Sequence, residues 1–190
     1  MKNHRTVRLL LNALVLLPLL SLLSLTQAGC RSRTDRSEGN VLLTIASFNG
    51  LPSVVSLGSQ QPPFVIGDLT VRNIAKDPTG STSELQAVEL RTLEVRFQRR
   101  DTGTRVPPAN VQSIFGLVPV NGTTTLTNVP FLTSDQVLNQ PLKDLRDTGR
   151  DSETGTAVVV LDVSMRVFGR TLSGDDIVSD PARFTIEVRP

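Results

Sequence analysis

The side chains of this sequence that could do chemistry are mostly carboxylates. Asp175, Asp176 and Asp180 lie within six residues of one another, and Asp162 precedes them. Calcium takes six to eight oxygen ligands, so a loop that holds these carboxylates is a candidate calcium site. The spacing matches no known ligand loop, and the EF-hand pattern is missing. A solvated turn is therefore the favoured interpretation, and calcium binding is the alternative.

Several reactive residue types are missing after residue 29. The single histidine, His4, precedes that point, and the whole sequence has no tryptophan, no tyrosine and one cysteine, Cys30. Zinc sites built from cysteine and histidine are thereby excluded, as are Ser–His and Cys–His nucleophilic catalysis. Stacking on nucleobases would depend on seven phenylalanines alone. These absences predict a protein that is not an enzyme and binds no nucleic acid.

Two Asp-Thr-Gly triplets, at residues 101–103 and 147–149, resemble the paired motif of aspartic proteases. In that family two aspartates in close contact share one proton and activate a water molecule. The family places its aspartate after an apolar strand, whereas here arginines precede both Asp101 and Asp147. Because Asp-x-Gly is also an ordinary turn sequence, two turns are favoured. A carboxylate-based hydrolase is the less favoured alternative.

Three arginines, Arg99, Arg100 and Arg105, surround the first triplet. Such a basic group could contact lipid phosphates. Because Asp101 lies among these arginines, we expect a hydrated hairpin tip instead.

The first 29 residues follow the order of an export signal. Residues 1–8 carry three basic residues and no acid, and residues 9–25 form a 17-residue apolar run interrupted by Asn12 and Pro18. A membrane-spanning helix needs about 20 mostly apolar residues, so this run is marginal for one. A charged segment, an apolar segment and small residues before a cleavage site are typical of a secretory signal peptide.

The residues after this run, Gln27-Ala28-Gly29-Cys30, resemble the lipobox of bacterial lipoprotein precursors. The resemblance implies cleavage between Gly29 and Cys30 and a diacylglycerol on the Cys30 sulfur, with palmitate as an acyl group. Gln27 stands where that family usually has leucine. An ordinary secretory signal and an uncleaved anchor helix are the alternatives. Arg31 is not the aspartate that resembles an inner-membrane retention signal, which favours an outer membrane in a cell that has one.

The charge of the chain changes once the predicted signal is removed. Residues 1–29 contain three of the 20 basic residues and no acid, which leaves 17 basic residues against 18 acidic ones. A nearly neutral chain argues against the strong phosphate electrostatics of a nucleic-acid binder. Residues 31–40 contain no apolar residue and predict a flexible tether.

Residues 41–190 predict a single all-β domain. Apolar and polar residues alternate at 93–98, 159–167 and 183–189, the period of half-buried strands. Asn121-Gly122 predicts a type I′ hairpin, and a change of phase at Arg91-Thr92 predicts a β-bulge. Short strands with turns every 8–12 residues predict a β-sandwich of about seven to eight strands.

Residues 157–189 resemble the final hairpin of immunoglobulin-like or fibronectin type III-like domains of exported bacterial proteins. This implies an immunoglobulin-like sandwich at 41–190, after a signal peptide at 1–29 and a lipidated Cys30 with its tether at 30–40. We expect a non-enzymatic binding, adhesion or envelope-structural module, anchored in the bacterial cell envelope, with no cofactor beyond the covalent lipid. Its expected partners are the membrane and an envelope protein or surface ligand. A calcium-dependent ligand-binding module is the alternative.

Overall fold

The structure is a computed structural model that describes residues 39–190. The predicted signal peptide, Cys30 and most of the predicted tether lie outside the described residues. Nine strands and three short helical segments make up the regular structure of the described part. The strands are β1 (Val41–Asn49), β2 (Val54–Ser56), β3 (Phe64–Ala75), β4 (Val88–Arg99), β5 (Asn110–Val118), β6 (Thr123–Leu132), β7 (Val159–Thr171), β8 (Asp176–Val178) and β9 (Ala182–Arg189). The helical segments are η3 (Glu84–Gln86), α2 (Ser134–Val137) and α3 (Leu142–Thr148).

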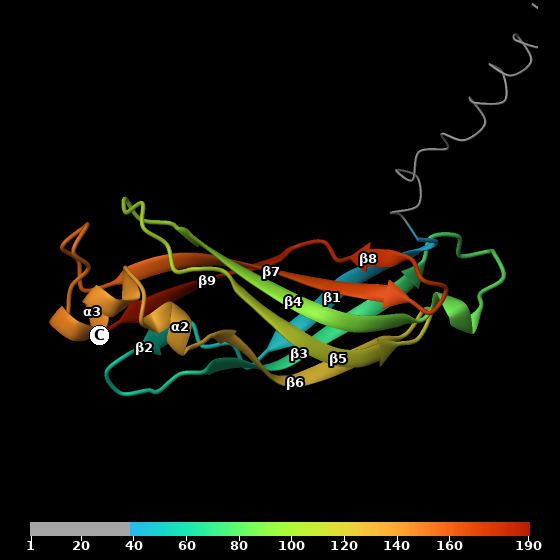
Figure 1. Ribbon diagram of the computed structural model, residues 1–190, viewed down its shortest axis with the longest axis horizontal. Coiled ribbons are helices and arrows are strands. Elements are labelled where there is room, and N and C mark those ends of the chain that lie inside the picture. Colours follow the sequence, from blue (N-terminus) through green and yellow to red (C-terminus); the bar gives the residue numbers. More distant parts are fainter. Residues whose placement is uncertain (1–38) are drawn as a thin grey trace, which may run out of the picture. The chain divides into compact units, whose positions relative to one another are not determined.

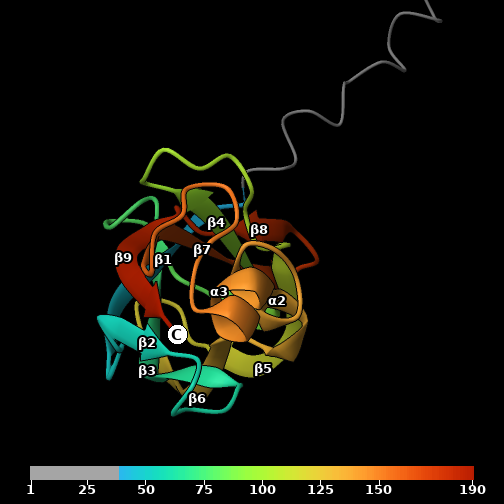
Figure 2. The same cartoon turned by 90° about the vertical axis from the view of Figure 1, so that its left-hand side faces the viewer.

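The strands form two sheets that pack face to face (Figure 1 and Figure 2). The smaller sheet has the order β1-β3-β6, and the six-stranded sheet has the order β2-β9-β7-β4-β5 with β8 paired to β7. Within the described residues all strand pairs are antiparallel except β2 with β9. The predicted all-β sandwich is therefore confirmed, with two three-residue strands, β2 and β8, among its nine. The immunoglobulin-like topology stays a prediction.

The longest strand, β7, illustrates how the core forms. Its inward-facing residues, all fully buried, are Val159, Leu161, Val163, Met165 and Val167. This is the alternation that the sequence predicts, since successive side chains of a strand point to opposite faces. Phe184 of β9 packs edge-on against Phe131 of β6, with ring centroids 5.8 Å apart, and so joins the two sheets. Because both sheets bury their apolar faces against each other, residues 39–190 have the packing of a self-contained domain.

The register of β4 contains the predicted bulge. Pairing with both β5 and β7 shifts between Leu90 and Thr92, where the phase of the sequence changes. The shift keeps Leu90 and Leu93 buried although they are an odd number of residues apart. Beyond the bulge, β4 directs Glu94, Arg96 and Gln98 away from the core.

The predicted type I′ hairpin at Asn121-Gly122 is wrong: Gly122 has no positive φ, and the turn runs from Pro119 to Gly122 with Val120 and Asn121 at its centre. Asn121 adopts a φ of 55°, and the Gly122 N–H donates to the Pro119 carbonyl. The strands on either side, β5 and β6, belong to different sheets. Side chains bridge this seam: the Gln112 amide donates to the Pro130 carbonyl at 2.6 Å, and the Thr124 hydroxyl donates to the Leu117 carbonyl at 2.7 Å.

The segment between β6 and β7 contains two short helices. Thr133 and Gln136 form a capping box around α2, and α3 follows Pro141. Pro141 is the N-cap residue of α3, where a missing N–H costs no hydrogen bond because the first N–H groups of a helix have no intrahelical acceptor. None of the helical segments in the described range is long and apolar enough to span a membrane.

Candidate ligand-binding surface

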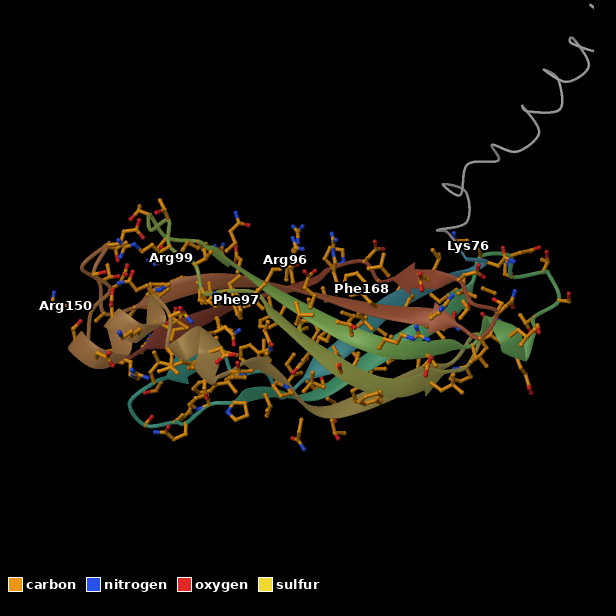
Figure 3. The ribbon with its side chains drawn as sticks, viewed as in Figure 1. Lys76, Arg96, Phe97, Arg99, Arg150 and Phe168 are labelled. Carbon is orange, nitrogen blue, oxygen red and sulfur yellow. The ribbon has the colours of Figure 1, made fainter. Side chains whose placement is uncertain are left out.

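Three strands of the six-stranded sheet align polar side chains on the face that points away from the core. Arg96 of β4 is paired in register with Ser164 of β7, and Ser164 is paired with Arg183 of β9. Directly opposed side chains of an antiparallel pair are about 5 Å apart at Cβ. Ser164 therefore lies between two arginines, in one row across the sheet. Figure 3 shows Arg96 pointing away from the three-stranded sheet.

The next row continues this surface. Gln98, Asp162 and Thr185 are aligned across the same three strands. The Thr185 hydroxyl donates to Asp162 Oδ1 at 2.6 Å and accepts from Arg100 Nη1 at 3.4 Å. Together the two rows surround a hollow of about 670 Å³. Its lining includes three arginines, Arg96, Arg100 and Arg183, and two hydroxyl residues, Ser164 and Thr185.

The charges on this face are predominantly positive. Four arginines on this face are exposed: Arg96, Arg100, Arg166 and Arg183. We refer to these four residues as the arginine face. Two carboxylates, Glu94 and Asp162, lie among them, so the formal charge of the face is +2.

Only one of the four arginines of the arginine face has an ion pair within the described residues. Arg96 contacts Glu94 Oε1 at 2.7 Å, and the hydrogen bond to Glu94 raises the pKa of this guanidinium. Arg166 and Arg183 form no ion pair or hydrogen bond there, so their donors face solvent. Guanidinium groups bind carboxylates and phosphates with two parallel hydrogen bonds. The surface is therefore suited to an anionic ligand.

Arg99, next to Arg100 in sequence, faces the other way and is buried. Its Nε lies 2.6 Å from Asp101 Oδ1, and its Nη2 lies 2.9 Å from Asp151 Oδ2. The expected hydrated tip is thus wrong for Arg99, whose side chain is 2% exposed. The alternation of β4 explains the burial, because Arg99 continues the inward phase of Val95 and Phe97.

The two carboxylates of this buried group are held ionised. Burial raises the pKa of Asp101, but hydrogen bonds from Arg99 and from the backbone N–H groups of Gly103 and Val160 outweigh burial and leave the pKa below its ordinary value. Burial likewise raises the pKa of Asp151, and bonds from the Thr154 hydroxyl and Arg99 outweigh it. Asp101 and Asp151 both contact the Arg99 guanidinium. Their shared partner therefore joins the end of β4 to the loop after α3.

The two Asp-Thr-Gly triplets have different structural roles. Asp101 binds Arg99, whereas Asp147 lies in the last turn of α3 and pairs with Arg146 at 2.7 Å. Gly149 is the C-cap of that helix, with a φ of 75°, so the predicted turn at 147–149 is a helix end. Neither aspartate has the other among its hydrogen-bond partners, and the protease-like dyad does not form.

The carboxylates of Asp175 and Asp176 contact different partners. Asp175 Oδ2 accepts from the Ser173 hydroxyl at 3.0 Å, and Asp176 lies 3.6 Å from Arg170 Nε. The backbone carbonyl of Asp180 accepts from the Ser179 hydroxyl. Between residues 39 and 190 no group of three or more histidine, cysteine or acidic side chains is arranged to hold a metal ion. Both the solvated turn and calcium binding stay predictions.

The predicted lipidation and cleavage residues, Gly29 and Cys30, lie outside the described residues, so that site stays a prediction. Sequence reasoning missed the Arg96–Ser164–Arg183 row and the pairing of Arg99 with Asp151. The inward phase of residues 93, 95 and 97 was a signal for Arg99. The row depends on strand register, which has no local signal.

Comparisons with known proteins identify no family. No protein-family description matches the sequence, and no curated protein matches it. Among solved structures, a solution structure described as a late embryogenesis abundant (LEA) protein is similar, with a TM-score of 0.40 and 12% identity. The match covers 90% of this chain and 83% of that protein. A likeness this distant supports no statement about family or function.

Proposed function

We propose that this protein is a lipid-anchored, non-enzymatic binding module of the bacterial cell envelope. The observation that carries the proposal is Gln27-Ala28-Gly29-Cys30 at the end of a charged and apolar leader. Two acyl chains give stable membrane attachment, whereas one gives only marginal attachment, so a lipidated Cys30 needs no membrane-spanning helix. The fold supports this arrangement, since the first strand of a domain with its own core begins at Val41, eleven residues after Cys30.

Four carboxylates of the domain have environments that suit a non-enzymatic role. A carboxylic acid that donates a proton at neutral pH needs a raised pKa. Among the described carboxylates with a resolved shift, which are Asp77, Asp101, Asp151 and Glu153, the pKa of each is lowered by hydrogen bonds. Their environments stabilise the charged form, which favours ion pairs and loop structure over acid catalysis.

The binding partner that we propose is a component of the envelope in which the anchor lies. An outer membrane is favoured in a cell that has one, because Arg31 follows the cysteine. A calcium-dependent module is a weaker candidate, because Asp175 and Asp176 bind separate neighbours in the domain.

The experiment uses the full chain in a bacterial host grown with labelled palmitate. We expect the protein to incorporate label, to lose residues 1–29 and to sediment with membranes. Cys30→Ala should incorporate no label and remain unprocessed. Arg31→Ala is the matched control, because it changes the adjacent residue and leaves the cysteine in place. Cleavage and membrane sedimentation of Cys30→Ala without label would overturn the lipoprotein assignment.

A further inference from the structure

The arginine face concentrates positive charge on a domain whose overall charge is negative. Residues 39–190 contain 14 basic and 16 acidic side chains, a formal charge of −2. The arginine face, with Glu94 and Asp162 included, carries +2. Such an asymmetry orients the molecule toward anionic surfaces, because exposed charges act over about 10 Å at moderate ionic strength. We infer that this face binds the phosphate groups of anionic phospholipid headgroups.

The central row has the geometry of a phosphate cradle. Neighbouring strands are about 4.8 Å apart, so the backbones that carry Arg96 and Arg183 are separated by roughly 10 Å, with Ser164 midway. Two long guanidinium side chains can then approach one tetrahedral anion from opposite sides, while the Ser164 hydroxyl donates from below. Arg183 is available for this, since it forms no ion pair among the described residues.

The residues on either side of this row restrict where a phosphate can bind. Arg100 adds a third guanidinium from the side of Thr185. Asp162 accepts from the Thr185 hydroxyl and repels an anion on that side, so the phosphate lies over Ser164. On the other side Glu94 draws Arg96 toward itself at 2.7 Å, and a phosphate competes with this carboxylate, which is 15% exposed, for the guanidinium.

The position of Gly39 favours a lipid phosphate over a soluble one, and this step rests on the proposed lipid anchor. Gly39 lies against Ile177 and Asp175, next to the turn between β7 and β8. Ile177 pairs with Gly169, and Ser164 is five residues further along β7, about 17 Å away. The nine residues from Cys30 to Gly39 span at most about 32 Å. A lipid on Cys30 can therefore enter the same bilayer surface that the arginine face touches.

The test uses residues 39–190, which have a self-contained core and lack Cys30. Co-sedimentation is measured with vesicles of phosphatidylcholine alone and of phosphatidylcholine with 30% phosphatidylglycerol. We expect binding only to the second kind, weakening as salt rises. Each basic residue near an anionic surface contributes about fivefold, so Arg96→Gln with Arg183→Gln should weaken binding about 25-fold. Arg183→Lys should weaken binding less than Arg183→Gln, because the charge is kept while the two-donor guanidinium geometry is lost.

Arg72→Gln is the matched control, because Arg72 is exposed on the outer face of the smaller sheet. It removes the same charge from a different surface and should change binding less than twofold. Equal binding to both kinds of vesicle would overturn the inference, as would equal losses from Arg72→Gln and Arg183→Gln. Binding to soluble inorganic phosphate or a soluble polyanion without binding to vesicles would also overturn it. Because this fragment lacks Cys30, its result is independent of the palmitate experiment, and either proposal can fail alone.

Discussion

Arg99 and Asp151 are 52 residues apart in the sequence, yet Arg99 Nη2 lies 2.9 Å from Asp151 Oδ2 in a pair closed to solvent. A buried ion pair persists only where further hydrogen bonds satisfy both partners. Here Asp101 holds the other side of the guanidinium, and Thr154 donates to the Asp151 carboxylate. The pair fixes the loop after α3 to the end of β4.

Asp151→Asn should destabilise the domain by about 3 kcal/mol, because it leaves a buried guanidinium with one carboxylate instead of two. This loss is in the lower part of the range for a broken buried ion pair, since Asp101 still binds Arg99. Urea unfolding followed by circular dichroism measures the change. Asp147→Asn is the control, because the Asp147 pair with Arg146 is partly exposed and should contribute at most about 1 kcal/mol. Equal losses from the two variants would contradict this account.

Acid should weaken the domain through the same group. The pKa values of Asp101 and Asp151 are lower in the folded state than the value of about 3.9 expected for an unfolded chain. The unfolded state therefore binds protons first as the pH falls. This stability is fully present above the unfolded pKa and is lost as the pH falls through the folded pKa values. Urea midpoints should decline on acidification below about pH 5, with a smaller slope for Asp151→Asn.

Leu161→Ala should cost about 2–5 kcal/mol, because the Leu161 side chain is fully buried in the centre of the six-stranded sheet. Leu117→Ala removes the same atoms from a side chain that is 52% exposed and should cost about 0.5 kcal/mol or less. Thermal and urea unfolding of the two variants provide the comparison. A loss for Leu117→Ala as large as that for Leu161→Ala would show that the inward face of β7 is not the core.

Gly149→Ala should destabilise α3 by about 1 kcal/mol, because Gly149 adopts a φ of 75° that β-carbon-bearing residues avoid. No atom lies within 4 Å of the position of an added β-carbon, so the cost is conformational and not steric. Gly149→Asn should cost less, since asparagine tolerates this conformation. The order glycine, asparagine, alanine in urea midpoints tests whether this residue of the triplet is a helix cap.

The sequence predicts the sheets better than it predicts their surfaces. Alternation identifies the buried face of β7 because one period-two pattern extends over nine residues. Alternation also places Arg99 on the buried face of β4. The charges of Arg99 and Arg100, however, predict that both side chains are exposed. Only the partner on another loop, Asp151, makes the burial of Arg99 favourable, and a contact across 52 residues leaves no local pattern.

The assignment of β5 and β6 to different sheets could not be predicted from the sequence either, for the same reason. Asn121-Gly122 indicates a turn, which lies one residue earlier than predicted, and the flanking residues have strand character, yet the two strands enter different sheets. Which neighbour a strand pairs with depends on competition among all strands for hydrogen-bond partners. The arginine row depends in the same way on the register of β4, β7 and β9. Fold class is thus readable from short-range pattern, and a surface built across three strands is not.

The division into two sheets also determines how mechanical tension would pass through the molecule. Gly39 leads into β1, which lies at an edge of the smaller sheet and is hydrogen-bonded to β3 alone. The arginine face belongs to the larger sheet, and in the described chain no strand pair joins the two. Pulling between an anchored N-terminus and a ligand held by the arginines would load β1 first. We expect this edge strand to detach before the larger sheet is disturbed, so the bound surface would outlast the first step of forced unfolding.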